Sequence, residues 1–175
     1  MKDRLYEAGK FIRKHSKADD FTLFIRGNDT LQTRFAQNAI TQHISGNNIT
    51  AYLSVAFDDK RGSANINQLD NDSLLYLIKT AENIAKINQP DPEFVPSESD
   101  SQYTCTKLFS KETAKLDSAK LVDNVQKSVE NAQKADAKLS GITEREISQV
   151  YVNTKNGFEG YFDNTYFSHS MTMKK

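Results

Sequence analysis

The three histidines of the chain, His15, His43 and His169, are the side chains best suited to bind a transition metal. A hydrolytic zinc site needs two histidines on one helix face, a third ligand and a carboxylate that acts as the general base. No histidine here is followed by glutamate, and none lies three to five residues from another. The sequence therefore predicts partly exposed imidazoles on strands and at a helix end, and the open alternative is a metal site that all three form together in space.

Nucleophilic catalysis also lacks its usual sequence context. No Gly-x-Ser-x-Gly motif occurs, and Ser63 has the wrong flanking residues for a nucleophile elbow. We expect Ser63 to be a strand residue whose small size suits close packing of a helix. The single cysteine, Cys105, excludes an intramolecular disulfide and fits a reducing compartment. A reactive thiol would need a base or a positive potential beside it, so we predict no catalytic, cofactor-binding or metal-binding residues in this chain.

The remaining polar motifs are typical of turns and linkers. Adjacent side chains at the end of a strand point apart, so Asp58 and Asp59 are not placed to act as a pair of carboxylates. We interpret them as a polar turn. The acidic, proline-rich stretch 91–100 lacks the alternating oxygen ligands of a calcium loop, so we interpret it as part of a solvated connector over residues 89–101. Gly46-Asn47 and Asn156-Gly157 predict hairpin turns, since neither opens a helix in the manner of a phosphate-binding loop.

Composition narrows the class of protein. The chain has 175 residues, with 23 Lys and Arg against 23 Asp and Glu, so its formal net charge is zero. A nucleic-acid-binding protein usually has a basic bias or stripe, and the lysines of residues 107–138 instead alternate with acidic residues. No window approaches the ~20 apolar residues that a membrane-spanning helix needs. We therefore expect a cytoplasmic protein with no membrane partner and no nucleic-acid partner.

Period-two patterns predict an antiparallel β meander over residues 21–66. The clearest strand contains apolar residues at every second position from Ile49 to Phe57. Turns are predicted at residues 26–29, 37–38, 46–48 and 58–60, which divides the region into about five short strands. The turn at Gln37-Asn38 is inferred from a change of phase in the alternation, because an uninterrupted strand would bury the wrong face beyond it.

Apolar stripes at helical spacing predict three amphipathic helices, over about residues 3–17, 71–88 and 112–138. Asp70 is a good N-cap for the second helix. After these helices, alternation returns, with a hairpin at Asn156-Gly157, a return strand over 158–162 and a further strand over 166–173. The fold class is therefore α+β: an antiparallel meander covered by helices in residues 1–140, followed by a second hairpin region in residues 141–175. We expect the latter to continue into a further domain of a longer protein.

Four segments together resemble the amino-terminal domain of the TldD/PmbA family. They occur in the family's order, and the resemblance covers about residues 21–173. These segments are Thr33-Arg34-Phe35-Ala36-Gln37-Asn38-Ala39-Ile40-Thr41-Gln42, Arg61-Gly62-Ser63-Ala64-Asn65-Ile66-Asn67, Leu69-Asp70-Asn71-Asp72-Ser73-Leu74 and Val152-Asn153-Thr154-Lys155-Asn156-Gly157. The last departs from the family pattern, with Thr154 where serine is commoner and one extra residue before Gly157.

The resemblance implies a two-domain protein whose paired subunits enclose a cavity with a zinc centre that acts on small unfolded polypeptides. Family members with peptidase activity carry a His-Glu-x-x-x-His helix in their carboxy-terminal half, and no position of this chain matches that motif. Some members lack the zinc ligands and serve as the partner of an active subunit, and an older family name is modulator of DNA gyrase.

Two main hypotheses follow from the residues and the resemblance, and a third, association with nucleic acid, rests only on the older gyrase name. In the first, the chain is the non-catalytic amino-terminal domain of a metallopeptidase, and it provides oligomer contacts and a wall of the substrate cavity. Its partners would be a family subunit in a homo- or heterodimer and peptide substrates, and zinc is expected only in the carboxy-terminal half. In the second, the chain belongs to an inactive partner, scaffold or binding module of the same family.

Overall fold

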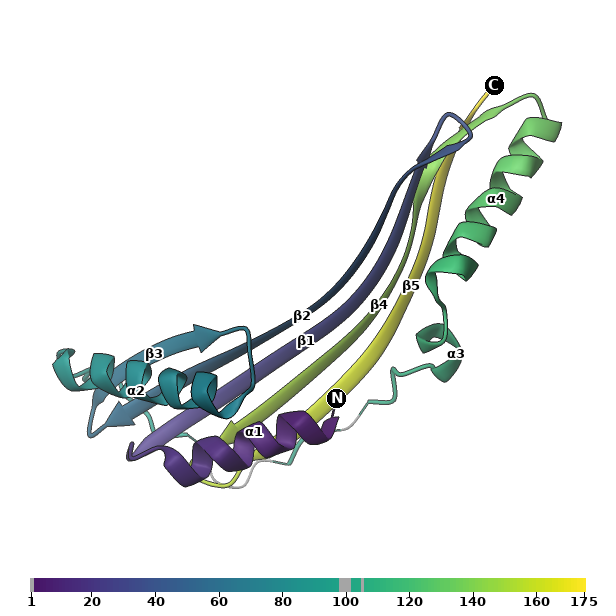
Figure 1. The fold of residues 1–175 in the computed structure, drawn as a ribbon. Helices are drawn as coiled ribbons and strands as arrows, with labels where there is room; N and C mark the ends of the chain where they lie inside the picture. The colour runs from purple at the N-terminus through teal and green to yellow at the C-terminus, as the bar shows by residue number, and fades with distance from the viewer. Residues whose placement is uncertain (1, 98–101, 105) are drawn as a thin grey trace. The chain divides into compact units, whose positions relative to one another are not determined.

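A computed structural model describes residues 2–97, 102–104 and 106–175 of the chain. Cys105 and the end of the predicted connector, residues 98–101, lie outside the described residues. The chain forms α1 (Lys2–His15), β1 (Asp20–Ala36), β2 (Ala39–Phe57), β3 (Lys60–Ile66), α2 (Asn71–Ile87), α3 (Lys111–Ala114), α4 (Ser118–Lys134), β4 (Lys138–Thr154) and β5 (Glu159–Lys174). Figure 1 shows this order along the ribbon.

The strands form one five-stranded antiparallel sheet in the order β3-β2-β1-β4-β5 (Figure 1). The α+β class predicted from sequence is confirmed. β4 pairs with β1, so the predicted second hairpin region joins the same sheet as the meander. The domain boundary near residue 140 stays a prediction.

Three of the predicted turns are confirmed: those at residues 37–38, at residues 58–60 and at Asn156-Gly157, which lies between β4 and β5. Gln37 and Asn38 both have positive φ, 54° and 63°, and connect β1 to β2. Positive φ at both central residues is the geometry of a type I′ hairpin, which Asn tolerates well. Asp58, with φ of 52°, lies in the turn that connects β2 to β3. Its backbone N–H donates to the Asp19 carboxylate over 3.0 Å.

The turns predicted at residues 26–29 and 46–48 are wrong, because both segments lie inside strands β1 and β2. Gly, Asn and Asp favour turns locally, but β1 has a paired strand on each side, which satisfies its backbone groups in extended form. Asn28 also accepts a hydrogen bond from the Ser148 hydroxyl of β4 over 3.1 Å. The strands predicted at 158–162 and 166–173 are one strand, β5, which pairs with β4.

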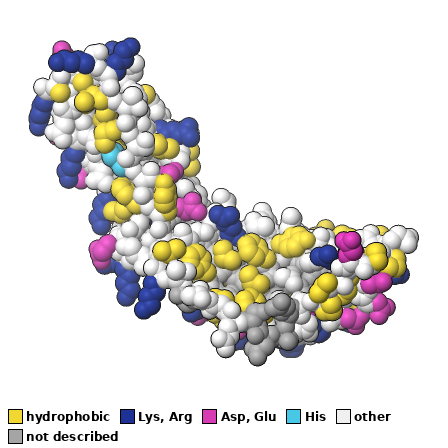
Figure 2. Space-filling view, turned by 180° about the vertical axis from the view of Figure 1, so that it is seen from behind, with side chains coloured by type: hydrophobic (Ala, Val, Ile, Leu, Met, Phe, Trp, Pro, Cys, Tyr) yellow, Lys and Arg dark blue, Asp and Glu magenta, His cyan; other side chains and the backbone are white. Residues whose placement is uncertain are grey.

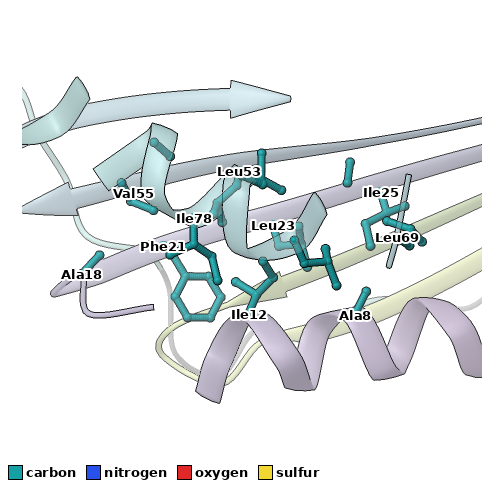
Figure 3. Close-up of a cluster of buried hydrophobic side chains, with 14 of the residues drawn as sticks. Ala8, Ile12, Ala18, Phe21, Leu23, Ile25, Leu53, Val55, Leu69 and Ile78 are labelled. Atoms are coloured by element: carbon teal, nitrogen blue, oxygen red, sulfur yellow. The ribbon is translucent and has the colours of Figure 1, made fainter. Parts of the chain in front are cut away.

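The chain divides into two compact units. Unit 1 comprises Met1–Gly27, Ile49–Thr106 and Gln149–Phe162, and unit 2 comprises Asn28–Asn48, Lys107–Ser148 and Asp163–Lys175. In unit 1, α1 and α2 cover the apolar face of the sheet. Ala8 and Ile12 of α1 point towards Phe21 and Leu23 of β1 (Figure 3). Leu53, Val55 and Ile78 complete the centre of this cluster.

Unit 2 has a smaller core beneath α4. It consists of Phe35, Val125, Ala132 and Leu139, with Val129 packed against them. The single helix predicted over 112–138 is instead two, α3 and α4. Asp117 starts the second helix, because its carboxylate accepts from the Lys120 N–H over 2.9 Å and acts as an N-cap. Because Asp117 begins a new helix, the apolar stripe that predicted one helix is divided between α3 and α4.

The other helix predictions are confirmed within two residues. Asp70 is the N-cap of α2, and its carboxylate accepts from the Ser73 N–H over 2.9 Å. Accepting these hydrogen bonds lowers the pKa of Asp70, since they favour its charged form. Among the helices of the described residues, none is long and apolar enough to cross a membrane.

Candidate functional site

The three histidines were the sequence's candidates for chemistry, and the structure places them in separate surroundings. His15 ends α1 and stacks on Phe11 of the same helix, with ring centroids 4.2 Å apart. His43 and His169 lie on β2 and β5 within unit 2. Across the described parts of the chain, no three His, Cys, Asp or Glu side chains are grouped closely enough to hold a metal ion.

His43 lies in a row of three polar side chains that joins two strands to α4. Its Nδ1 is 2.8 Å from the hydroxyl of Thr33 on β1, and its Nε2 is 2.9 Å from the hydroxyl of Ser118, the first residue of α4. Thr33 is fully buried, whereas His43 is exposed. We call these three residues the His43 row.

His169 lies in a second row of the same composition. Its Nδ1 contacts the hydroxyl of Thr143 on β4, and its Nε2 is 3.2 Å from the hydroxyl of Ser128 on α4. The ring also stacks on Phe35, with centroids 6.1 Å apart. We call Thr143, His169 and Ser128 the His169 row. Both rows therefore connect the sheet to α4 through an imidazole ring.

Each row has the order serine, histidine, hydroxyl group, which resembles a catalytic triad. In a Ser-His-Asp triad, however, the third group is a carboxylate that stabilises the imidazolium formed when the serine loses its proton. Thr33 and Thr143 carry no charge and cannot do this. In the His169 row, the Ser128 hydroxyl donates its proton to the Asn124 carbonyl over 2.9 Å. His169 Nε2 therefore donates to Ser128, and its Nδ1 accepts from Thr143.

The geometry of the rows supports a structural role. The Ser128 hydroxyl already donates its proton to a carbonyl and cannot also give it to a general base. His43 contacts the neutral hydroxyl of Thr33, whereas an anionic partner would be needed to make it a strong general base. Two surface hollows of about 490 and 480 Å³ lie near α4 and the β1–β2 turn, and neither is lined by His43 or His169. What the rows can do is bind α4 to the sheet by directional hydrogen bonds.

Arg145 provides a further link, which sequence reasoning missed. This side chain of β4 is only 5% exposed, and its guanidinium lies 3.1 Å from the Asp29 carboxylate. It also donates to the backbone carbonyls of Asp29 and Leu116, over 3.0 and 3.3 Å. Leu116 directly precedes the N-cap of α4, so Arg145 ties the start of that helix to the sheet. The sequence offered one clue: Arg145 lies two residues from Thr143, so the two side chains point to the same face of β4, where both are buried.

Glu82 was missed for a similar reason. It lies on α2 beside the apolar stripe and is almost fully buried. Its carboxylate accepts from the Ser16 hydroxyl over 3.1 Å and from the Lys17 N–H over 2.7 Å. These donors follow the end of α1, so Glu82 joins the two helices of unit 1. A charged residue next to an apolar stripe is the signal that could have identified it.

The structure corrects the role predicted for Ser63. Ser63 is exposed, and its neighbour Gly62 is the residue that packs closely against α2. A Cβ atom added to Gly62 would lie 2.3 Å from the Ala81 carbonyl oxygen and 2.3 Å from the Ala85 nitrogen. The backbone of β3 can approach α2 this closely only because residue 62 has no side chain.

The acidic residues predicted to form turns and a linker make structural contacts where they are described. Asp91 lies 3.5 Å from the Arg61 guanidinium, and its N–H donates to the Asp59 carbonyl. Ser97 donates through its N–H and hydroxyl to the Asp20 carboxylate, over 2.8 and 2.5 Å. The described part of the connector is therefore fastened to the strands by hydrogen bonds and one ion pair.

Comparison with known proteins gives structural matches but no sequence match. No protein-family model and no curated protein sequence matches the chain. The crystal structure of TldE from Thermococcus kodakarensis has a TM-score of 0.79 and 17% identity, and the match covers 100% of this chain and 39% of that one. The chain is thus about two fifths the length of the solved structures it matches.

Two further crystal structures are of proteins assigned as candidate modulators of DNA gyrase. The protein from Bacteroides thetaiotaomicron has a TM-score of 0.75 and 19% identity over 97% of this chain and 40% of that one. The protein from Thermotoga maritima has a TM-score of 0.70 and 14% identity over 98% of this chain and 42% of that one. The chain has the fold of part of TldE and of these two proteins, and the resemblance to the TldD/PmbA family is confirmed at the level of fold.

Proposed function

We propose that this chain is the non-catalytic amino-terminal domain of a TldD/PmbA-type metallopeptidase that acts on small unfolded peptides. In this role it contributes oligomer contacts and a wall of the substrate cavity. The observation that carries the proposal is that the fold over the whole chain matches two fifths of TldE. The polar side chains of unit 2 that could support hydrolysis are occupied in holding α4 to the sheet.

A physical argument supports a structural role for this chain and a catalytic role for another part of the protein. A hydrolytic zinc site needs at least three protein ligands around one metal ion and a carboxylate base, and the described histidines are not grouped with acidic residues in this way. Long paired strands with a helix fixed across them form a rigid surface, which suits a wall or an oligomer contact. The reactive groups would then belong to another part of the protein.

The test is to purify the 175-residue chain, measure its zinc content by plasma mass spectrometry and incubate it with an unstructured fluorogenic peptide. We expect no stoichiometric zinc and no hydrolysis. Hydrolysis that a chelator abolishes and added zinc restores would refute the proposal. A double variant, His43→Ala with His169→Ala, serves as control, because loss of that hydrolysis would assign it to the two rows.

A scaffold or partner role in the same family is the alternative, and the names of two structural neighbours favour it. The two proposed functions make different predictions for a longer polypeptide that continues past Lys175. A longer protein with a zinc-binding His-Glu-x-x-x-His helix and peptidase activity supports the first function, and one without both supports the second. Retention of DNA by the 175-residue chain on a native gel, lost as salt is raised, would point to nucleic-acid binding.

A further inference from the structure

Two tyrosine rings of unit 1 share one ammonium group of the chain itself. The Lys2 Nζ atom lies 5.6 Å from the centre of the Tyr6 ring and 4.9 Å from the centre of the Tyr161 ring. Tyr6 belongs to α1 and Tyr161 to β5, and their ring centroids are 6.2 Å apart. A cation within about 6 Å of an aromatic ring is attracted by the negative face of that ring. We call Tyr6 and Tyr161 the tyrosine pair.

Packing holds both rings of the pair in place. Tyr6 packs on the fully buried Tyr151, with ring centroids 5.0 Å apart, and the Tyr151 hydroxyl donates to the Glu159 carboxylate over 2.6 Å. Tyr161 packs against the same core cluster, and its backbone N–H donates to the Tyr103 hydroxyl over 3.1 Å. A site whose groups are already in position loses less free energy to ordering when a ligand binds.

Carboxylates near the tyrosine pair favour a positive charge there. Burial, and then the charge of the Glu159 carboxylate, raise the pKa of Tyr6, so the negative potential of this carboxylate reaches the ring. A surface hollow of about 500 Å³ beside Tyr6 is lined by Asp3, Glu7 and two lysines. One of these lysines, Lys10, is paired with Glu7 over 2.9 Å. The other carboxylates therefore remain to attract the cation on the rings.

The surface as a whole offers no such preference. On the face shown in Figure 2, Lys and Arg side chains lie among acidic and hydrophobic ones, and the formal net charge of the chain is zero. Attraction over long distances therefore favours neither sign of ligand. A preference for a cation has to come from local groups such as the tyrosine pair.

Lys2 is the replaceable part of this arrangement. Its side chain is exposed, and a lysine ammonium is a compact, strongly hydrated charge on a flexible stem. Water competes with the rings for such a group, so an exposed contact of this kind is weak. A trimethylammonium group donates no hydrogen bond to water and is the type of cation that aromatic rings recognise well. It can therefore take the place of the Lys2 ammonium.

We propose that the tyrosine pair is a binding site for a trimethylammonium group, and that Lys2 occupies this site when no such ligand is bound. Choline and the trimethylated side chain of lysine both carry the group, and the site recognises the chemistry that they share. Lys2 then acts as a competitor within the chain and sets the affinity of the site. This inference goes beyond the proposed function and does not depend on it.

A titration followed by nuclear magnetic resonance tests the site with choline as the probe. The ring protons of Tyr6 and Tyr161 in the 175-residue chain are followed as choline is added. The matched neutral probe is the alcohol in which carbon replaces the choline nitrogen, because it has the same shape without the charge. We expect saturable shifts of both rings and about tenfold tighter binding of choline than of the alcohol. Equal binding of the two probes, or rings that do not respond, would overturn the proposal.

Two lysine variants separate the site from the general effect of charge. Lys2→Met removes the competing ammonium and should tighten the binding of choline by about fivefold. Lys10→Met removes the same charge from the same helix, but its ammonium lies on Glu7 and not on a ring. Because exposed charges are screened by water and salt, this control should change the affinity by less than about twofold. Equal effects of the two variants would reject the site.

A tyrosine variant tests the ring contact itself. Tyr161→Leu removes one ring but keeps an apolar side chain against the core, and it should weaken choline binding by about threefold. Tyr76→Leu, on α2, is the control and should leave the affinity unchanged. Circular dichroism confirms that each variant keeps its fold. Folded Tyr161→Leu that binds choline as tightly as the parent would contradict the proposal.

The source of the trimethylammonium group is distinguished by a second probe, the amide of acetylated trimethyllysine. Tighter binding of this probe than of choline assigns the site to a modified polypeptide, and weaker binding assigns it to a small molecule. Both results support recognition of the shared group. The unmethylated lysine amide should bind more weakly than the trimethylated one, since water retains its ammonium. Equal binding of the two lysine amides would refute the preference on which the proposal rests.

Discussion

Among the described residues, Tyr151 has the largest fully buried side chain. It is fully buried, and its hydroxyl donates to the Glu159 carboxylate over 2.6 Å. Tyr6 packs beside it with ring centroids 5.0 Å apart. On α1, Gly9 passes so close that an added Cβ atom would lie 2.0 Å from the Tyr151 hydroxyl. The helix can occupy this position only with glycine at residue 9.

Gly9→Ala is therefore expected to destabilise the chain. Alanine gains about 1 kcal/mol of helix propensity over glycine, but overpacking against a buried ring costs about 1–3 kcal/mol. Because the added atom would lie so close to the buried ring, we expect the upper end of this cost, about 3 kcal/mol, and predict a net loss of about 2 kcal/mol in the free energy of unfolding, measured by urea denaturation. Gly46→Ala is the control, because an added Cβ atom there meets no atom within 4 Å. Equal stability of the Gly9 variant and the parent would contradict the predicted clash.

Tyr151 also makes stability depend on pH in the alkaline range. Burial, and then its hydrogen bond to Glu159, raise the pKa of Tyr151 well above its ordinary value. Because the folded-state pKa is raised, the stabilisation is complete below the unfolded pKa of about 10 and is lost as pH rises above it. There the unfolded chain ionises while the folded one does not.

We predict that above pH ~10 the free energy of unfolding falls by up to about 1.4 kcal/mol per pH unit through Tyr151 alone. Tyr151→Phe should lose this part of the slope, although it will be less stable at neutral pH. Tyr76→Phe, which removes a phenol hydroxyl from a side chain that is 66% exposed, is the control. Denaturation curves between neutral and alkaline pH provide the measurement, and identical slopes for parent and Tyr151→Phe would reject the prediction.

At the scale of the elements, the two histidine rows determine how α4 is held on the sheet. The rows have the same composition but differ in solvent access. His43 is exposed, whereas His169 is partly buried and stacked on Phe35. Water can replace a lost partner of His43 but reaches His169 less easily. The two rows therefore provide a matched pair of sites within one protein.

Thr143→Val should cost more stability than Thr33→Val. Valine has nearly the shape of threonine but no hydroxyl group, so each change removes one contact with an imidazole Nδ1. A buried polar atom left without a partner costs about 1–3 kcal/mol, so we expect that range at Thr143. At Thr33 we expect less than about 1 kcal/mol, since water can bond to the exposed ring. Chemical denaturation measures both, and a larger loss at Thr33 would show that the rows are wrongly interpreted.

At the scale of the whole molecule, the two units differ in how much apolar surface they bury. Among the described residues, the cluster of unit 1 has 17 buried members, whereas that of unit 2 has 4. Local opening is easiest where few buried apolar contacts oppose it. Polar links, through the rows and Arg145, therefore carry a larger share of the stability of α4 than of α2.

We predict that the backbone amides of α4 exchange with deuterium faster than those of α2. The two helices have the same length, 17 residues, which makes them a fair comparison. Hydrogen exchange followed by mass spectrometry gives the protection of each helix. Protection of α4 equal to that of α2 would mean that its hydrogen bonds to the sheet compensate fully for the smaller core.

Much of the fold could be predicted from local patterns. The α+β class, the helices α1 and α2, and the turn at Gln37-Asn38 were all evident, because helical stripes and paired left-handed turn residues are set by neighbours in sequence. The chain also carried the segments that resemble the TldD/PmbA family. The absence of a His-Glu-x-x-x-His motif came from the residues alone.

Tertiary structure decided the rest. Gly27, Asn28 and Asp29 favour a turn by themselves, yet they lie within β1 because β2 and β4 satisfy their backbone groups from both sides. His43 contacts Ser118, which is 75 residues away in the sequence, and His169 contacts Ser128, which is 41 residues away. Arg145 donates to the carbonyl of Leu116, which is 29 residues away. Strand pairing and buried polar contacts of this kind join distant residues, and no local pattern specifies which residues will meet.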